Sequence, residues 1–128
     1  CCSEQRFTHA ADFMARLVIR NALFGGWGRV DSLLIPRSTY TDPEIASVGL
    51  TERSAAANHI PFERIEQPFA GVDRAVLDGD TAGLVKILVS PGGKRILGAA
   101  AVGPHAGDLL GELTLAMQTG VGPGKLAN

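Results

Sequence analysis

Apolar residues recur at helical spacing over residues 8–24, where Phe13, Leu17 and Phe24 lie near one face. Two glycines follow and end the periodic stretch. Thr8 is the candidate N-cap of this helix. Asp12 and Arg16 are four positions apart, so the spacing predicts an ion pair on the solvent side.

A second pattern, of extended and turn segments, fills residues 33–58. Residues 33–40 predict an extended strand, which Pro36 restricts to an edge or to its first part. The run 41–44, with Pro43 at its third place, predicts a turn. Alternating apolar residues over 45–50 then predict a strand with one buried face. Thr51 is a plausible N-cap for a helix that reaches about Asn58.

The remaining pattern predicts one weak strand, one hairpin and one long helix. Residues 61–69 have no cleanly apolar face and predict a strand exposed on one side. Residues 70–82 predict a loop with a short helix near 73–77. Residues 84–89 and 95–102 predict a hairpin, because glycines in the connection supply the positive φ of a tight turn.

The last clear element is a helix that begins at His105 or Ala106 and ends at Thr119, before Gly120. Three glycines recur every fourth residue near its start and predict a smooth strip for close backbone approach. Its expected apolar stripe consists of Leu109, Leu110, Leu113, Ala116 and Met117.

This order of elements predicts an α+β fold, a mixed or antiparallel sheet with helices packed on one face. With 128 residues and 45% hydrophobic content, the chain is long enough for one domain and a remnant of another. We place the boundary in the glycine-rich connector, with a remnant at 1–27 and a domain at 28–128. Trp27 is expected to pack within that connector.

Charge and composition argue against several partners. The formal net charge of -1 arises from mixed acidic and basic residues, so no basic stripe predicts nucleic-acid binding. No apolar run is long enough for a membrane span, and the first residues lack the layout of a signal peptide. A soluble, cytoplasmic protein is the expectation. Cys1 and Cys2 are adjacent and cannot join distant segments as a disulfide.

Known catalytic and metal-binding patterns do not occur in the sequence. His9, His59 and His105 are far apart and lack ligand neighbours at metal-site spacing, so we predict no metal. Neither a Gly-x-Gly-x-x-Gly unit after a strand nor a Gly-x-Ser-x-Gly elbow is present. The sequence therefore predicts no catalytic residue in this chain.

Residues 40–52 carry the most specific signal in the sequence. They resemble the start of the C-terminal dimerisation domain of the flavin-dependent pyridine nucleotide-disulfide oxidoreductases, which include lipoamide dehydrogenase and mercuric reductase. The pattern is aromatic-Thr-x-Pro-Glu-x-Ala-x-Val-Gly-x-Thr-Glu. The residues that fit it are Tyr40, Thr41, Pro43, Glu44, Ala46, Val48, Gly49, Thr51 and Glu52.

The resemblance implies that the first helix is the last helix of an FAD-binding domain. In the family its N-terminus points at the flavin, because unpaired N–H groups and the positive helix end stabilise a reduced flavin. Phe7, Thr8 and His9 are then the expected cofactor-binding residues. The Asp-Phe-Met-Ala-Arg run after them resembles mercuric reductase-like members. The implied cofactor is FAD, and NAD(P)H is the implied co-substrate of the parent protein.

The family's catalytic groups are not found here. They are a Cys-x4-Cys disulfide near the flavin and a His-Glu pair expected beyond residue 128, so we expect the fragment alone to be inactive. The resemblance also implies a homodimer, with the helix at 105–119 near its two-fold axis. The electron acceptor and the choice between NADH and NADPH are not specified by these residues.

Two alternatives stay open at the level of sequence. The chain could be a stand-alone α+β interaction module that dimerises without flavin or catalysis. It could also use His9 and Asp12 as an acid-base pair, although the first turn of a helix offers no evident substrate cleft.

Overall fold

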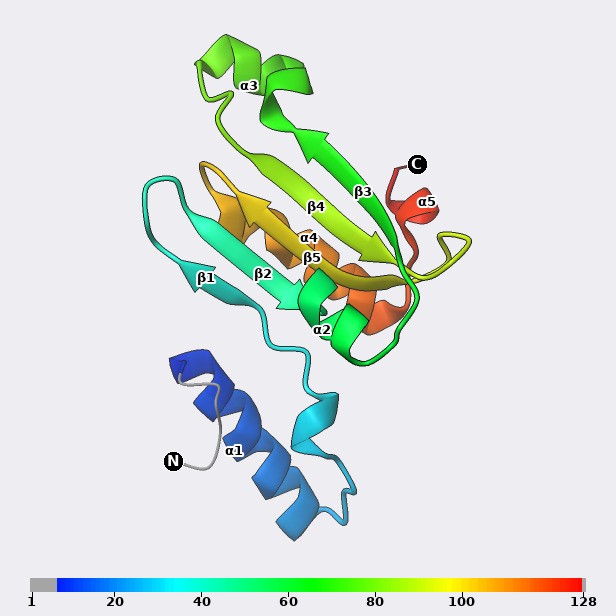
Figure 1. Cartoon of the computed structure of the whole chain (residues 1–128). Coiled ribbons are helices and arrows are strands. Elements are labelled where there is room, and N and C mark those ends of the chain that lie inside the picture. The colour runs from blue at the N-terminus through cyan, green and yellow to red at the C-terminus, as the bar shows by residue number, and fades with distance from the viewer. Residues whose placement is uncertain (1–6, 128) are drawn as a thin grey trace. The chain divides into compact units, whose positions relative to one another are not determined.

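The computed structural model describes residues 7–127. The chain divides into two compact units, Cys1–Ile35 and Pro36–Asn128. The first unit contains α1 (Thr8–Leu23) and the 3-10 helix η1 (Val30–Ser32). The second contains a five-stranded sheet and the remaining helices (Figure 1). The assignment of residues 1–27 to an FAD-binding domain stays a prediction.

The helix α1 matches the predicted range closely but not the predicted cap. Phe7, in extended conformation, is the N-cap residue, and Thr8 is already the first helical residue. The predicted cap was therefore wrong by one position, and Phe7 makes no side-chain hydrogen bond to the helix. The predicted ion pair is confirmed, since Arg16 Nε lies 2.8 Å from Asp12 Oδ2.

The connector after α1 is held by the side chain of Asn21, a residue of that helix. Asn21 Nδ2 donates to the carbonyl of Gly28, and the Gly28 N–H donates back to Asn21 Oδ1. Gly25 adopts φ +63°, which ends the helix as the glycine pair predicted. Trp27 does not pack in the connector, because its side chain is 95% exposed. That prediction was wrong, since Asn21 rather than the indole closes the loop.

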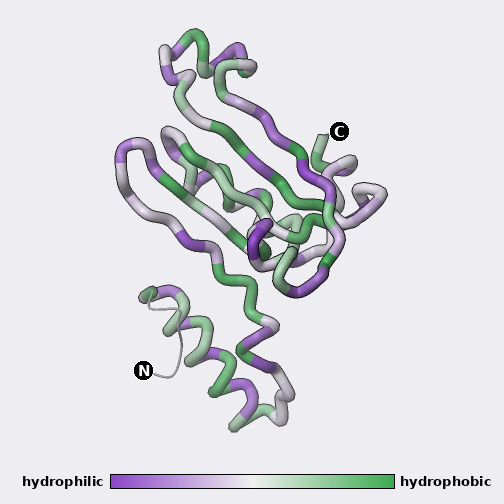
Figure 2. The backbone as a smooth tube through the Cα atoms, in the orientation of Figure 1, coloured by the Kyte–Doolittle hydropathy of each residue, from purple (hydrophilic) through white to green (hydrophobic). Residues whose placement is uncertain are grey.

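The sheet is antiparallel throughout. Its order is β1-β2-β5-β4-β3, so β1 and β3 are its edges. The fold class was thus predicted correctly, with the antiparallel option realised. Figure 2 shows a largely hydrophilic tube along β3 beside more hydrophobic β4 and β5. The strands are β1 (Arg37–Thr39), β2 (Ile45–Gly49), β3 (Glu63–Pro68), β4 (Leu84–Val89) and β5 (Ile96–Val102).

The core lies between the sheet and α4 (Ala106–Thr119), which packs on β5, β2 and β1. Strand residues facing it are mostly small, such as Ala46, Ala99 and Ala101, all buried. Small residues let the helix approach closely, so its leucines supply much of the core volume. The helix residues that are buried are Ala106, Leu110, Leu113 and Ala116.

Two predictions for α4 need correction. Leu109 belongs to the predicted apolar stripe but is 42% exposed, because it lies on the side of the helix that the sheet does not cover. The glycine strip is not one surface either. Gly103 precedes the helix, a Cβ at Gly107 would meet side chains of Ser38 and Glu44, and one at Gly111 would meet open space.

The short elements follow the sequence more closely. Thr51 caps α2 (Glu52–Ala57), with a reciprocal capping box to Ser54, as its position predicted. The loop 70–82 contains η2 (Phe69–Gly71) and α3 (Asp73–Asp78), and α5 (Pro123–Leu126) closes the described chain. Of the predicted strand at 33–40, only the residues of β1 form a strand. The 3-10 helix η1 and irregular residues come before them. Pro36 precedes β1, which is an edge strand.

Candidate functional site

The predicted cofactor-binding residues lie together at the start of α1. Phe7, Thr8 and His9 are all exposed, and the rings of Phe7 and His9 stack with centroids 5.5 Å apart. The first turn carries no acidic side chain, and the N-cap residue provides no side-chain acceptor. Such a helix start is electropositive and suits an electron-rich group. The role of these three residues in binding a flavin stays a prediction.

The second unit contains an apolar groove of about 610 Å³. It lies beside the first half of α4 and is bordered by η2 and α3, with β3 and β4 contributing to its lining. Leu109, exposed on the uncovered side of α4, lines it. The apolar lining consists of Phe69, Val72, Ala75, Val85, Pro104 and Leu109. A groove of this composition is typical of a contact surface rather than of a solvated face.

Acidic side chains dominate the polar part of the groove. Arg74 is partnered within α3, since its Nε lies 2.7 Å from Asp78 Oδ2. His105, at the start of α4 with φ 55°, places Nδ1 3.8 Å from Asp108 Oδ2. The carboxylates that line the groove are Asp78, Asp80, Asp108 and Glu112. Sequence reasoning missed this groove, because its walls come from segments about thirty residues apart that only folding brings together.

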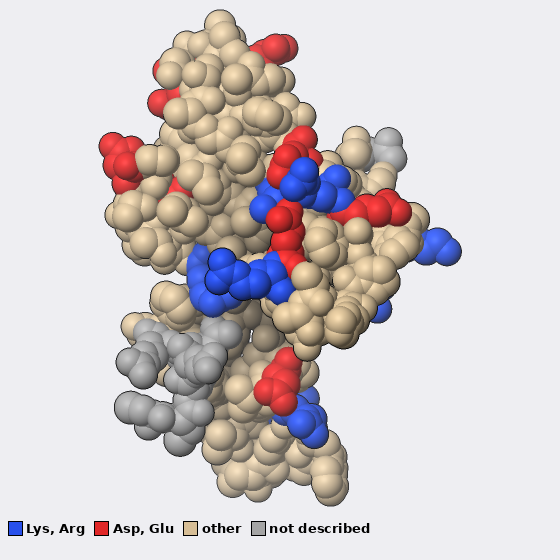
Figure 3. All heavy atoms as spheres, viewed as in Figure 1, with Lys and Arg blue, Asp and Glu red and all other residues tan. Residues whose placement is uncertain are grey.

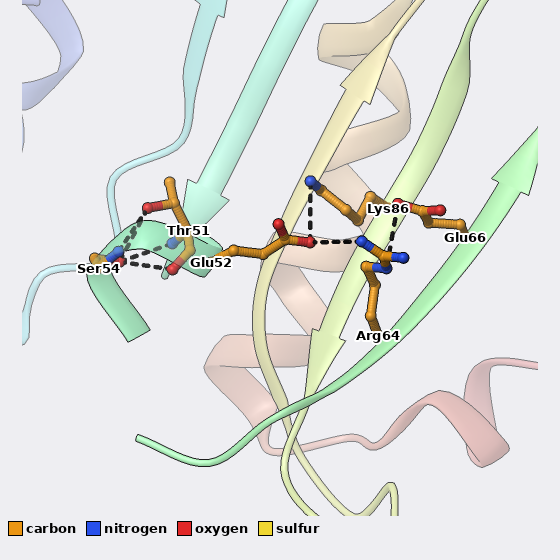
Figure 4. A network of polar contacts seen from close by, with 6 residues as sticks. All are labelled: Thr51, Glu52, Ser54, Arg64, Glu66 and Lys86. Atoms are coloured by element: carbon orange, nitrogen blue, oxygen red, sulfur yellow. Dashed lines mark hydrogen bonds and ion pairs between the residues drawn. The ribbon is translucent and has the colours of Figure 1, made fainter. Parts of the chain in front are cut away.

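A network of charged side chains lies on the face of the sheet opposite α4 (Figure 4). Glu52 Oε1, from the start of α2, lies 3.3 Å from Lys86 Nζ on β4 and 3.4 Å from Arg64 Nη1 on β3. Arg64 Nε also lies 3.4 Å from Glu66 Oε1. Figure 3 shows acidic and basic side chains gathered at the centre of this view. The network therefore connects the start of α2 to β4 and to the edge strand β3.

The pKa of the Glu52 carboxyl is held below its ordinary value. The first cause is the hydrogen bond from Lys86, and contacts with Arg64 add to it, while partial burial opposes it. Because the folded pKa lies below the unfolded one, the ionised carboxylate stabilises the fold above the unfolded pKa. This contribution is lost as pH falls through the folded pKa.

We therefore expect Glu52→Gln to lower the free energy of unfolding at pH 7. The difference from the native chain should shrink as the pH is lowered below the ordinary pKa of a glutamate, which urea denaturation at several pH values measures. Lys86→Gln, alone and combined with Glu52→Gln, gives the coupling between the two groups. A difference that stays constant down to the most acidic folded state would contradict this assignment.

Within residues 7–127, no three His, Cys, Asp or Glu side chains come together as metal ligands would. Over the same residues, no helix has the length and apolar character needed to cross a membrane. Cys1 and Cys2 lie outside the described residues.

A family model of known proteins matches residues 35–128, and it describes the pyridine nucleotide-disulphide oxidoreductase dimerisation domain. The chain belongs to this family. The match covers the whole sheet, the groove and the charged network of the dimerisation domain. It confirms the resemblance that residues 40–52 carry.

Curated relatives of this dimerisation domain are longer proteins. The chain is 42% identical over 95 residues to the mitochondrial dihydrolipoyl dehydrogenase of Schizosaccharomyces pombe, covering 74% of this chain and 19% of that protein. It is 33% identical over 116 residues to a mercuric reductase of Staphylococcus aureus, covering 91% and 21%. The chain thus spans about a fifth of the length of these relatives.

The fold of the dimerisation domain also recurs in solved structures. The HOCl-induced flavoprotein disulfide reductase RclA from Escherichia coli superposes with a TM-score of 0.75 at 26% identity. That likeness covers 90% of this chain and 27% of the reductase chain.

Proposed function

We propose that this chain is part of an FAD-dependent NAD(P)H:disulfide oxidoreductase, in which it supplies the homodimer contact and one edge of the flavin pocket. Membership of the dimerisation-domain family carries this proposal. Similarity to a dihydrolipoyl dehydrogenase and a mercuric reductase supports the activity of the parent. The candidate electron acceptors of the parent are mercuric ion, lipoamide and glutathione. A cytoplasmic location stays a prediction.

The cofactors belong to the parent protein. FAD would supply hydride and electron transfer chemistry, with NAD(P)H as the reductant. The start of α1 suits the electron-rich edge of a flavin, because its first turn has no acidic side chain. Phe7, Thr8 and His9 would lie at that edge. We expect the chain alone to turn over no NAD(P)H, because it contains neither a Cys-x4-Cys pair nor a nucleotide fingerprint.

For the homodimer, we propose that a second copy covers the apolar groove beside α4. Apolar side chains line it, and Leu109 is exposed within it although other leucines of the same helix, Leu110 and Leu113, are buried. Covering these side chains removes apolar surface from water, which is the main driving force of such association. The N-terminal half of α4 would then border the partner.

Replacing Leu109 with Asp should weaken this dimer by at least tenfold, since a charge would have to be buried among apolar side chains and beside Asp108. Sedimentation velocity of the full 128-residue chain over a range of concentrations measures the effect. Leu115→Asp is the matched control, because Leu115 is exposed on the same helix but does not line the groove. Equal loss in both variants would argue against the groove.

The alternative function is a stand-alone interaction module without flavin. The coding sequence before Cys1 discriminates the two. A parent oxidoreductase requires a Gly-x-Gly-x-x-Gly unit between a strand and a helix, and a Cys-x4-Cys pair. If that sequence encodes neither, the oxidoreductase proposal fails while the dimer proposal stands.

A further inference from the structure

Met117 lies near the end of α4 and is one of the two methionines of the chain. Its side chain is half-buried, whereas Leu113 and Ala116 of the same helix are buried. Met117 does not line the apolar groove, which lies beside the first half of α4. The surface that we propose for the homodimer therefore does not include it.

The end of the Met117 side chain occupies space that a missing side chain leaves free. Gly49 and Gly98 are opposite each other where the end of β2 pairs with β5. A Cβ at Gly49 would lie 2.5 Å from Met117 Cε and 2.6 Å from the carbonyl oxygen of Leu97. The methyl group of Met117 therefore packs on the backbone of Gly49, which a larger residue would not allow.

The backbone on both sides of this contact is held by hydrogen bonds. After β2, the N–H of Leu50 donates to the carbonyl of Leu97. After α4, the N–H of Val121 donates to the carbonyl of Ala116. Close-packed backbone of this kind does not easily absorb an added atom. The contact thus connects the last turn of α4 to the end of β2.

The thioether of Met117 brings oxidisable chemistry to this contact. Oxidation of a methionine converts a flexible apolar side chain into a polar, chiral sulfoxide. The added oxygen would be bound to Sδ, one bond away from the methyl group that packs on Gly49. Burying a polar group that has no hydrogen-bond partner is costly. A sulfoxide at this position would therefore favour withdrawal of the side chain from Gly49.

We propose that Met117 is a reversible oxidation site, at which a peroxide converts the thioether into a sulfoxide and thereby loosens the end of α4 from β2. A lone pair of Sδ attacks one peroxide oxygen, so that an S–O bond forms and the O–O bond breaks. The sulfur is oxidised by two electrons, and hydrogen peroxide is reduced. The second oxygen leaves as water with both hydrogens. A thiol-dependent methionine sulfoxide reductase would reverse the change.

The structural effect should be confined to the end of the helix. Leu110, in the first half of α4, packs on the sheet away from the Met117 methyl group and is fully buried. The domain should therefore stay folded after oxidation. The backbone N–H of Val121, which depends on the last turn of α4, should exchange its hydrogen at least tenfold faster.

The test uses the full chain with Cys1→Ser, Cys2→Ser and Met14→Leu, which leaves Met117 as its methionine. Dilute hydrogen peroxide is applied to the folded protein, and peptide mass spectrometry verifies one added oxygen on Met117 and none on the exposed Trp27. Urea denaturation followed by circular dichroism should show an unfolding equilibrium constant about tenfold higher. Treatment with a methionine sulfoxide reductase and a thiol should restore the original value.

Met117→Leu, made in the chain that lacks both cysteines but keeps Met14, is the matched control. Leucine has a volume close to that of methionine and cannot be oxidised, so this variant should fold. Met14 is half-buried in α1, which belongs to the first unit. The same peroxide treatment should leave the unfolding of the sheet and the exchange of Val121 unchanged in this variant.

Three results would each overturn the inference. In the first, Met117 is fully converted to the sulfoxide, yet neither the unfolding constant nor the exchange of Val121 changes. In the second, Met117 in the folded chain resists peroxide under conditions that oxidise it in the urea-unfolded chain. In the third, the Met117→Leu control loses as much stability on peroxide treatment as the chain that retains Met117.

Discussion

Replacing Leu110 with Ala is expected to lower the free energy of unfolding by about 2–5 kcal/mol. Leu110 lies on the sheet-facing side of α4 and is among the largest fully buried side chains of the chain's described part, residues 7–127. The facing strand positions are mostly alanines, so no long side chain is available to fill the space that the leucine leaves. The cavity would persist, and its cost adds to the lost burial of the removed atoms.

Chemical denaturation measures this loss, and using one protein concentration for all variants keeps any stabilisation by self-association comparable between them. Leu115→Ala is the matched control on the same helix. Leu115 is 61% exposed, so its truncation should change stability by less than about 0.5 kcal/mol. Similar losses in the two variants would mean that α4 does not pack on the sheet through Leu110.

Gly98→Ala is expected to be the second most damaging small substitution, with a loss of about 1–3 kcal/mol or more. A Cβ at Gly98 would overlap the carbonyl oxygen of Leu50 and lie 2.6 Å from its nitrogen. The Leu50 N–H also donates to the carbonyl of Leu97, so this backbone is held in place. Relief of the overlap would require the segment after β2 to move away from β5.

Gly111→Ala provides the matched control, with the opposite expected sign. Gly111 lies within α4, and a Cβ there would meet open space. Alanine should therefore stabilise the helix by about 0.5–1 kcal/mol. Thermal and urea denaturation of the two variants test both expectations. Equal effects from the two substitutions would show that the close approach at Gly98 is not the cause.

The sequence was a good guide wherever a local signal decides the structure. Thr51 was predicted as a cap and is one, because the capping box with Ser54 uses residues three positions apart. The hairpin of β4 and β5 followed from its glycine-containing turn in the same way. The prediction for Thr8 failed by one residue, because Phe7 takes the cap position with no side-chain bond to reveal it.

The sequence was a poor guide to surfaces. Three glycines were predicted to form a smooth strip on this helix for close approach by another backbone, yet a Cβ at Gly107 would meet side chains of Ser38 and Glu44 of its own domain. The strand at 61–69 was predicted to be exposed on one side, while every residue of β3 is exposed. Periodicity shows which residues are apolar, but not how far a neighbouring element reaches over them.

By itself, the sequence determined the family, the α+β class and nearly all the elements, because nine matched residues at fixed spacing and local turn and cap signals specify them. The tertiary structure alone decided that β3 is an open edge, that Glu52 reaches Lys86 and Arg64 across the sheet, and that η2, α3 and α4 enclose a groove. These features depend on strand order and on packing between distant segments. Neither strand order nor packing between distant segments produces a periodic pattern in the sequence.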